Sequence, residues 1–259
     1  MCDGRPAADY RLSGMEIAVG ALIGTVFLAA GLVKGVSGMG LPTLAMALLG
    51  LFMPPAAAAT LMVLPSLATN VTQCIGPHAP ALARRLWPMW LGLIAGTIFS
   101  PMQGLGAPGE GARILLGAVL IAYGLWGLVK PAPADPGRHS IAAGSLAGAL
   151  SGLLAASTGV FVMPLVPYLQ TLRLEKDRLI QALGLSFMIA TVSLAIRLGH
   201  TGIAMNTVDL ADLGIAIATA FLGLFIGTAL RNRMQPALFQ HALYAVFVLL
   251  GLVMVVKAL

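Results

Sequence analysis

A helix break at residues 34–42 decides the fold, and it reads Lys-Gly-Val-Ser-Gly-Met-Gly-Leu-Pro. Leu-, Ala- and Val-rich sequence continues on both sides of it, so three glycines and a proline interrupt one long apolar run. A second break, Ala-Ser-Thr-Gly-Val-Phe-Val-Met-Pro, lies at residues 156–164. A short apolar segment follows each break, at 41–53 and at 160–170. Both are too short to cross about 30 Å of hydrocarbon as a helix.

The composition places these breaks inside a membrane. Hydrophobic residues make up 59% of the 259 residues and charged residues only 9%, against about 25% charged residues in a soluble domain. This scarcity of charge excludes a soluble enzyme. The 31 glycines favour tightly packed helices. A β-barrel is not expected, because the alternating segments of about ten residues that build one are missing from the sequence.

The predicted fold is therefore an all-α polytopic membrane protein. The order long segment, break, short segment and three long segments occurs twice, and Pro42 corresponds to Pro164 at an offset of 122. We expect a polar tail (1–14), a first repeat (15–130), a cytoplasmic linker (131–140) and a second repeat (141–259). The ten predicted segments are 15–36, 41–53, 56–76, 86–103, 111–130, 141–156, 160–170, 178–198, 209–230 and 237–258.

The number of crossings predicts the relation between the two repeats. Each half has five crossings, or three if its long and short segments form a re-entrant hairpin, and either odd number turns the second half upside down. Such inverted repeats are common in secondary transporters. Nine of the 15 Lys and Arg lie in four loops, which predicts that these loops are cytoplasmic and that both termini lie outside. These basic residues set the membrane orientation of the protein, so its net charge of +6 does not indicate nucleic-acid binding. The four loops are 77–85, 130–140, 171–178 and 231–236.

The two breaks also form the predicted binding site, where they are expected to meet near the membrane midplane. Free N–H groups at the starts of the short helices, near Leu41 and Val160, would attract an anion. Lys34 either adds charge to this site or extends to the membrane interface. Simple helix packing is the alternative for each glycine and hydroxyl. The candidate residues at the breaks are Lys34, Ser37, Gly38, Gly40, Ser157, Thr158 and Gly159.

Amide side chains on the neighbouring segments extend this candidate site. Asn70 and Gln73 share one helical face, and Gln181 lies on the corresponding segment of the second half. Contacts between helices are the alternative role for these amides. None of the nine acidic residues falls in the middle of a span, so an anion fits better than a cation. Catalytic motifs and metal-ligand spacing are missing from the sequence, so we expect no catalytic residue, metal or cofactor.

Three stretches resemble the sulfite exporter TauE/SafE family: GLVKGVSGMGLPTLAM (31–46), AAAATLMVLPSLATNVTQ (56–73) and GLLAASTGVFVMPLVPYLQTLRLEKDRLIQALGLSF (152–187). The resemblance extends from about residue 15 to the end of the chain. Gly38-Met-Gly40 replaces the fuller Gly-Gly-Gly run often seen in the first break of the family. The resemblance implies a multi-pass transporter of the bacterial inner membrane for sulfite, organosulfonates and related anions. It also adds Pro42 and Pro164 to the candidate residues.

The sequence thus predicts a secondary transporter that exports sulfite or an organosulfonate. The anion would bind between the two breaks, and alternating access would move it. A channel-like anion uniporter, an importer of a small carboxylate or sulfur anion, and a non-transporting membrane subunit are the alternatives. The expected partners are a small anion and membrane lipids, with no nucleic acid. A homodimer is left open.

Overall fold

A computed structural model of the chain describes residues 7–101, 105, 110–129, 137–200, 209–231, 233 and 236–258. The first six residues of the predicted tail and residues 131–136 of the predicted linker lie outside the described residues. The boundaries of the two predicted repeats stay predictions.

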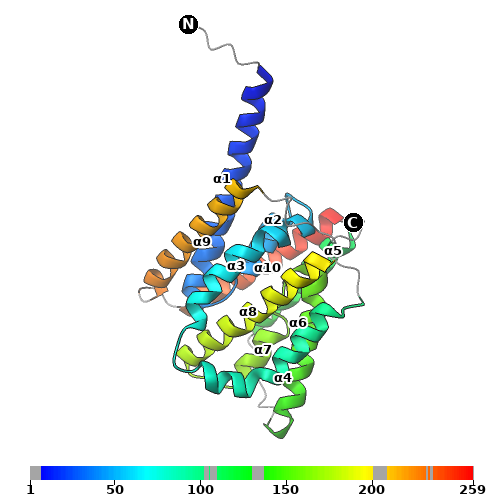
Figure 1. Ribbon diagram of the computed structural model, residues 1–259, viewed down its shortest axis with the longest axis vertical. Helices are drawn as coiled ribbons and strands as arrows, with labels where there is room; N and C mark the ends of the chain where they lie inside the picture. The colour runs from blue at the N-terminus through cyan, green and yellow to red at the C-terminus, as the bar shows by residue number, and fades with distance from the viewer. Residues whose placement is uncertain are drawn as a thin grey trace.

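The described regular structure is entirely helical (Figure 1). Each of the ten predicted segments corresponds to one α-helix, which confirms the all-α fold. The short segments are short helices of nine and seven residues, α2 and α7. The helices are α1 (Ala7–Ser37), α2 (Leu41–Leu49), α3 (Pro55–Cys74), α4 (Ala79–Ile98), α5 (Gly111–Val129), α6 (Ser140–Thr158), α7 (Leu165–Thr171), α8 (Lys176–His200), α9 (Leu210–Arg231) and α10 (Pro236–Ala258), with a 3₁₀ turn η1 (Gly137–His139) before α6.

Three helix starts differ from the prediction. α1 begins at Ala7 rather than at residue 15, so residues 7–14 of the predicted polar tail are helical. α4 begins at Ala79 rather than at residue 86, because hydropathy marks the membrane edge and not the helix end. Its first turns carry Pro80, suited to a helix start, and arginines, which are good helix formers. α7 begins at Leu165 rather than at Val160. Pro164 disfavours helical backbone in the residue before it, and the Val160 N–H donates to Thr158 Oγ1 at 3.1 Å instead of starting a helix.

Six described helices are long and apolar enough to cross a membrane: α1 from Ile17, α5, α6, α8, α9 and α10 from Leu238. Large apolar side chains on the outside of the bundle agree with lipid contact. Leu210 is 82% exposed and Phe225 is 76% exposed. A water-soluble protein would rarely expose a large continuous apolar surface. The chain is therefore a membrane protein with several spans.

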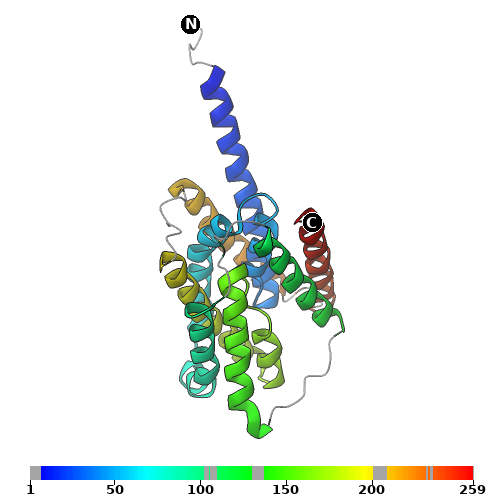
Figure 2. The same ribbon diagram turned by 90° about the vertical axis from the view of Figure 1, so that its right-hand side faces the viewer.

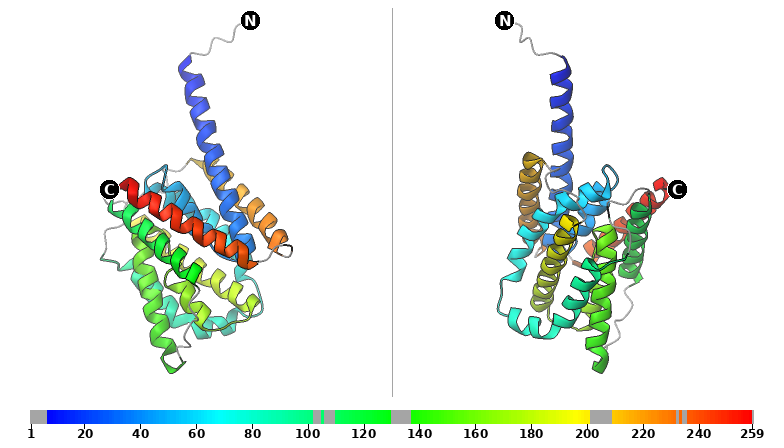
Figure 3. Two further views of the ribbon diagram at one scale, coloured as in Figure 1. Left: turned by 180° about the vertical axis from the view of Figure 1, so that it is seen from behind. Right: turned by 45° about the vertical axis from the view of Figure 1, so that its right-hand side comes forward.

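The helices pair in a pattern that supports an internal duplication. The main pairs are α1 with α9, α4 with α6, α3 with α8 and α5 with α10. If α1–α5 correspond in order to α6–α10, exchanging the halves turns the α1/α9 pair into the α6/α4 pair. The same exchange maps the other two pairs onto themselves. Figure 1 shows α3 beside α8, and the view from behind in Figure 3 shows α5 beside α10.

Corresponding helices run in opposite directions where they touch. Along α3 and α8, Gln73 lies against Gly184, while the Ser66 and Thr191 hydroxyls lie 3.4 Å apart. One helix therefore ascends as the other descends. The pair of α5 and α10 behaves in the same way, because Gly117 faces Gly251 whereas the later Gly124 faces the earlier Tyr244. Inversion of the complete halves stays a prediction, which these contacts favour.

Pairs of glycines spaced four residues apart close two of these helix contacts. A Cβ atom on Gly148 of α6 would lie 1.9 Å from the Met89 carbonyl oxygen of α4. One on Gly223 of α9 would lie 2.2 Å from the Leu28 carbonyl oxygen of α1. The backbones touch because no side chain separates them. The spacing of these pairs is visible in the sequence, although no helix pairing was predicted from it. They are Gly31/Gly35 with Gly223/Gly227, and Gly92/Gly96 with Gly148/Gly152.

Helix α1 is the longest, and its N-terminal part extends beyond the other helices (Figures 1 and 2). Its C-terminal half lies against α9 and runs parallel to it, since Gly20 faces Ile215 and Gly35 faces Gly227. This packing brings the end of α1, and with it the first break, to the C-terminal end of α9.

Candidate anion-binding site

The two breaks share one local geometry. In the first, the Ser37 hydroxyl donates to the Val33 carbonyl at 2.8 Å and accepts from the Met39 N–H at 3.3 Å. In the second, Thr158 donates to the Leu154 carbonyl at 2.7 Å and accepts from the Val160 N–H at 3.1 Å. A glycine with positive φ follows each hydroxyl residue: Gly38 at 80° and Gly159 at 71°. The breaks therefore correspond at an offset of 121, and the prolines at 122 because the second break is one residue longer.

α1 and α6 run in opposite directions, so the chain enters the two breaks from opposite ends of the bundle. At the first, Arg231 at the end of α9 donates through Nε to the Val36 carbonyl at 3.0 Å, and through Nη2 to the Gly35 carbonyl. α6 runs parallel to α4, and its Gly152 lies against Leu93 and Thr97 in the later turns of α4. The second break, which follows α6, therefore lies near the end of α4. The start of α4 lies on the other side, where His78 lines the same cleft as Arg231.

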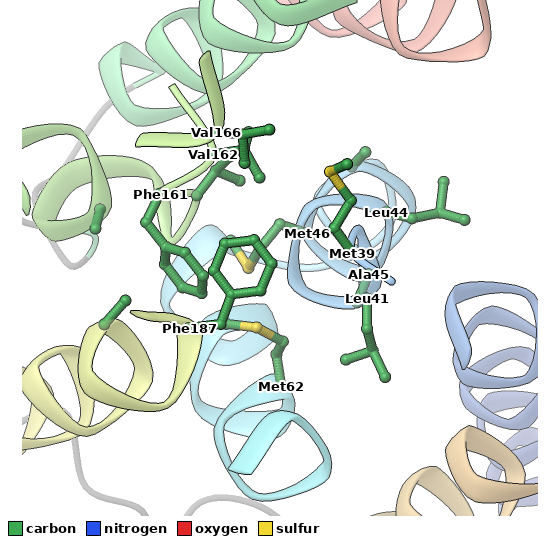
Figure 4. Close-up of a cluster of buried hydrophobic side chains, with 14 of the residues drawn as sticks. Met39, Leu41, Leu44, Ala45, Met46, Met62, Phe161, Val162, Val166 and Phe187 are labelled. Carbon is green, nitrogen blue, oxygen red and sulfur yellow. The ribbon is translucent and has the colours of Figure 1, made fainter. Parts of the chain in front are cut away.

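Apolar side chains fill the space where a polar meeting point was expected (Figure 4). Met46 of α2 and Met62 of α3 lie beside Phe161 of the second break and Phe187 of α8. The two phenyl ring centroids are 5.3 Å apart, and a Cβ on Gly159 would lie 3.0 Å from the Met46 sulfur. The expectation that the two breaks face each other across a polar site is wrong for this conformation, because Met and Phe side chains from four elements pack there. We call Met46, Met62, Phe161 and Phe187 the apolar plug.

Lys34 is the ionisable centre of the first break. Its side chain is 0% exposed, so it does not extend to the membrane interface. The Nζ atom donates to Thr69 Oγ1 at 3.0 Å and to Asn70 Oδ1. Thr69 uses its own hydrogen toward the Pro65 carbonyl, at 2.8 Å. Among the described residues no carboxylate lies within ion-pairing distance of Lys34, so its contacts supply no negative charge.

Two amides beside Lys34 leave polar atoms without partners. Asn70 is 0% exposed, and its Nδ2 has no hydrogen-bond partner among the described residues. Gln73, one turn further along α3, donates through Nε2 to the Gly38 carbonyl at 2.9 Å, while its buried Oε1 has no partner in the described part of the chain. A buried unpaired polar group costs about 1–3 kcal/mol. The unpaired donor of Asn70 beside a cation is suited to an oxyanion.

A cleft of about 640 Å³ opens beside this centre. Three of the four loops predicted to be cytoplasmic meet in it, through His78, Asp177 and Arg231. Gln181 also lines the cleft, where its Nε2 donates to the Cys74 carbonyl at 3.0 Å and its Oε1 accepts from the His78 N–H at 3.1 Å. Gln73 lines the cleft as well, and Asn70 lies one turn deeper along α3, where it accepts the hydrogen bond from Lys34 of α1. The complete lining is Thr72, Gln73, Ile75, Gly76, Pro77, His78, Asp177, Ile180, Gln181, Phe221, Leu224, Phe225, Thr228 and Arg231.

The model of the sulfite exporter TauE/SafE family matches residues 22–254, nearly the whole chain. The chain belongs to the TauE/SafE family. No match was found among curated proteins or among solved structures. TauE/SafE is a family of membrane transporters, and this agrees with the absence of catalytic motifs from the sequence.

In this TauE/SafE protein the predicted site residues divide into two groups. Lys34, Gly38, Asn70 and Gln73 are linked through hydrogen bonds at the first break, and Gln181 lines the adjacent cleft. Ser157, Thr158 and Gly159 lie at the second break, outside the cleft lining. Ser37 and Gly40 also belong to the first break, and the binding role of all ten residues stays a prediction.

The hydroxyls and glycines of this TauE/SafE chain also build the breaks themselves. Ser37 and Thr158 direct their hydrogens to backbone carbonyls, whereas the buried Ser157 hydroxyl has no partner among the described residues. Gly40 has a φ of 105° at the start of α2. Thr69 and Arg231 both contact the first break, although neither is among the predicted site residues. Thr69 could have been found from its place beside Asn70, but the position of Arg231 depends on how α9 packs on α1.

Proposed function

We propose that this chain is a secondary transporter of the bacterial inner membrane that exports sulfite or an organosulfonate. The anion enters from the cleft and binds beside Lys34 and Asn70. The observation that carries this proposal is a fully buried lysine whose two described acceptors, Thr69 and Asn70, are both neutral. A buried charge without a counterion is costly in a membrane, and a bound anion would remove that cost.

The hydrogen-bonding groups support an oxyanion in particular. The Asn70 amide has two N–H groups without a described partner, directly beside the cation. A sulfonate or sulfite group presents three oxygens, which can accept from the ammonium and from this amide together. Gln73 lies between this centre and the cleft, and its bond to the Gly38 carbonyl holds α3 against the first break. We propose that this bond must open for the anion to pass.

Alternating access is supported by the unequal ends of the bundle. The cleft lies next to the first break, on the side predicted to be cytoplasmic, because Gln73 and Arg231 both line the cleft and bond to that break. The apolar plug separates this break from the second one. The shared hydroxyl–glycine geometry and the antiparallel pairs of corresponding helices favour inverted repeats. Exchanging the conformations of two such repeats would open the second break and close the first.

Anion binding to the purified full-length protein tests the site. We expect sulfite and methanesulfonate to raise its thermal unfolding temperature in detergent. Lys34→Ala and Asn70→Ala should each weaken binding by about tenfold to a hundredfold, since a hydrogen bond to a charged group contributes about 1.5–3 kcal/mol. Lys257→Ala, at an exposed lysine near the end of α10, is the matched control and should bind as the wild type does. Unchanged affinity in both site variants would refute the proposed site.

Transport in proteoliposomes tests the carrier mechanism. A carrier loaded with unlabelled sulfite should accumulate labelled sulfite transiently by counterflow, and this uptake should saturate. Protein-free liposomes provide the background. Flux that neither saturates nor shows counterflow would identify a channel-like uniporter instead.

A further inference from the structure

The hydrogen bonds around the Lys34 Nζ match a neutral amine. A neutral amine has two N–H groups, and the described structure supplies two acceptors, Thr69 Oγ1 and Asn70 Oδ1. An ammonium group has three N–H groups. Among the described residues the third would have no acceptor. A buried lysine therefore needs a further partner only in its charged form.

The elements packed around Lys34 supply no negative charge. On α1 itself, Lys34 is the only ionisable residue between Ile17 and Ser37. The titratable side chain of α3 is the half-buried Cys74 thiol, and α2 has none. On α9, Arg231 donates to the Gly35 and Val36 carbonyls, whereas Asp212 lies near Gly20, toward the other end of α1.

More distant described elements also supply no negative charge to Lys34. α10 touches α1 only slightly, and its titratable residues are His241, Tyr244 and Lys257. Tyr244 packs against the ring of Tyr123 on α5. On α8 the nearest acidic group is Asp177, which lines the cleft beside Arg231. The charge of a protonated Lys34 is thus left for the bound anion to balance.

We propose that Lys34 binds a proton together with the anion, so that the protein transports protons as well as anions. This inference rests on the proposed function. As the anion enters, a proton from water binds the lone pair of the Nζ atom, and the new N–H donates to an oxygen of the anion. On the other side of the membrane the anion leaves and the proton returns to water. One proton moves with each anion, and no other reactant is needed.

The second half of the chain has no counterpart of this group. The offset of 121 between the breaks places Ala155 at the position that corresponds to Lys34. One proton-binding lysine therefore serves both conformations of the transporter. Sequence symmetry alone would have suggested two equivalent sites.

Proton uptake on anion binding tests this inference. Methanesulfonate is the probe because it stays ionised between pH 5 and 9, so any proton taken up must bind the protein. In weakly buffered detergent solution, wild-type protein should take up about one proton per bound anion, and its Kd should rise about tenfold per pH unit. Lys34→Arg keeps a permanent positive charge. It should bind the anion without proton uptake and with a Kd that does not change with pH.

Each outcome decides between the two proposals. Wild-type binding without proton uptake overturns proton transport and leaves the proposed function intact. No binding of sulfite or methanesulfonate by the wild type overturns both. Proton uptake that persists in Lys34→Arg assigns the proton to another group and also overturns the inference. Cys74→Ser removes the titratable group of α3 and should retain proton uptake. If Lys34→Arg does not fold, the wild type and Cys74→Ser decide through the number of protons taken up.

Discussion

In the proposed site, Asn70 determines which charge the first break can accept. Its amide oxygen receives a hydrogen bond from Lys34, and its amide nitrogen is left unpaired. An aspartate of nearly the same shape would supply the missing negative charge from within the protein. The difference between an amide and a carboxylate at this position therefore separates an anion site from an internal ion pair.

Asn70→Asp should weaken anion binding and leave the protein folded. The carboxylate would pair with Lys34 and repel an incoming anion, so we expect the affinity for methanesulfonate to fall at least tenfold, which corresponds to about 1.4 kcal/mol. Titration calorimetry measures the affinity, and thermal unfolding without ligand measures the stability. The unfolding temperature should equal or exceed that of the wild type. Retained affinity would show that the anion does not need the uncompensated charge of Lys34.

At the scale of single helices, glycines determine how closely two spans approach. The contact of α4 with α6 leaves no room for even one methyl group at Gly148, where a Cβ would overlap the Met89 carbonyl. Gly214 of α9, in contrast, has no atom within 4 Å of its Cβ position. Membrane helices gain little from the hydrophobic effect when they associate, so such backbone contact is an important source of their stability.

Gly148→Ala should destabilise the protein, and Gly214→Ala should not. We expect a loss of about 1–3 kcal/mol for the first, because the two helices must separate to admit the methyl group. The second should be neutral or stabilising by about 0.5–1 kcal/mol, since alanine favours helix more than glycine does. Thermal unfolding in detergent compares the two variants. Equal stability would show that this contact does not depend on direct backbone approach.

Helix identity was predictable at this scale, whereas some helix ends were not. All ten segments appear as helices because long apolar runs between glycine and proline breaks have few other solutions in lipid. The start of α7 was wrong because Thr158 and Pro164 act locally on backbone geometry. A hydropathy profile does not contain that information.

For the whole molecule, the cleft and the apolar plug define two unequal sides. Loops that lie far apart in the sequence meet at the cleft through His78, Asp177 and Arg231. These three residues belong to loops predicted to be cytoplasmic from their positive charge. The cleft is therefore predicted to face the cytoplasm, because the positive charge of these loops predicts that they lie on that side.

Labelling of single cysteines tests this orientation. In a background with Cys2 and Cys74 changed to serine, R84C near the start of α4 should react with a membrane-impermeant thiol reagent only from the cytoplasmic side. E110C, before α5, should react only from the outside. Both native side chains are exposed. Labelling of both positions from one side would contradict the predicted arrangement of crossings.

The sequence by itself determined the membrane environment, the ten helices, the repeated break and the preference for an anion. All four follow from local composition and spacing. Lipid restricts a backbone to helices, and charged residues are rare in such apolar segments, so the position of each one is informative. Only the tertiary structure decided that Lys34 is fully buried against Thr69 and Asn70, and that apolar side chains separate the two breaks. Those facts depend on how α1 packs on α3 and α9 and on which side chains fill the remaining space. Contacts between residues that lie far apart in the chain leave no periodic signal in a single sequence.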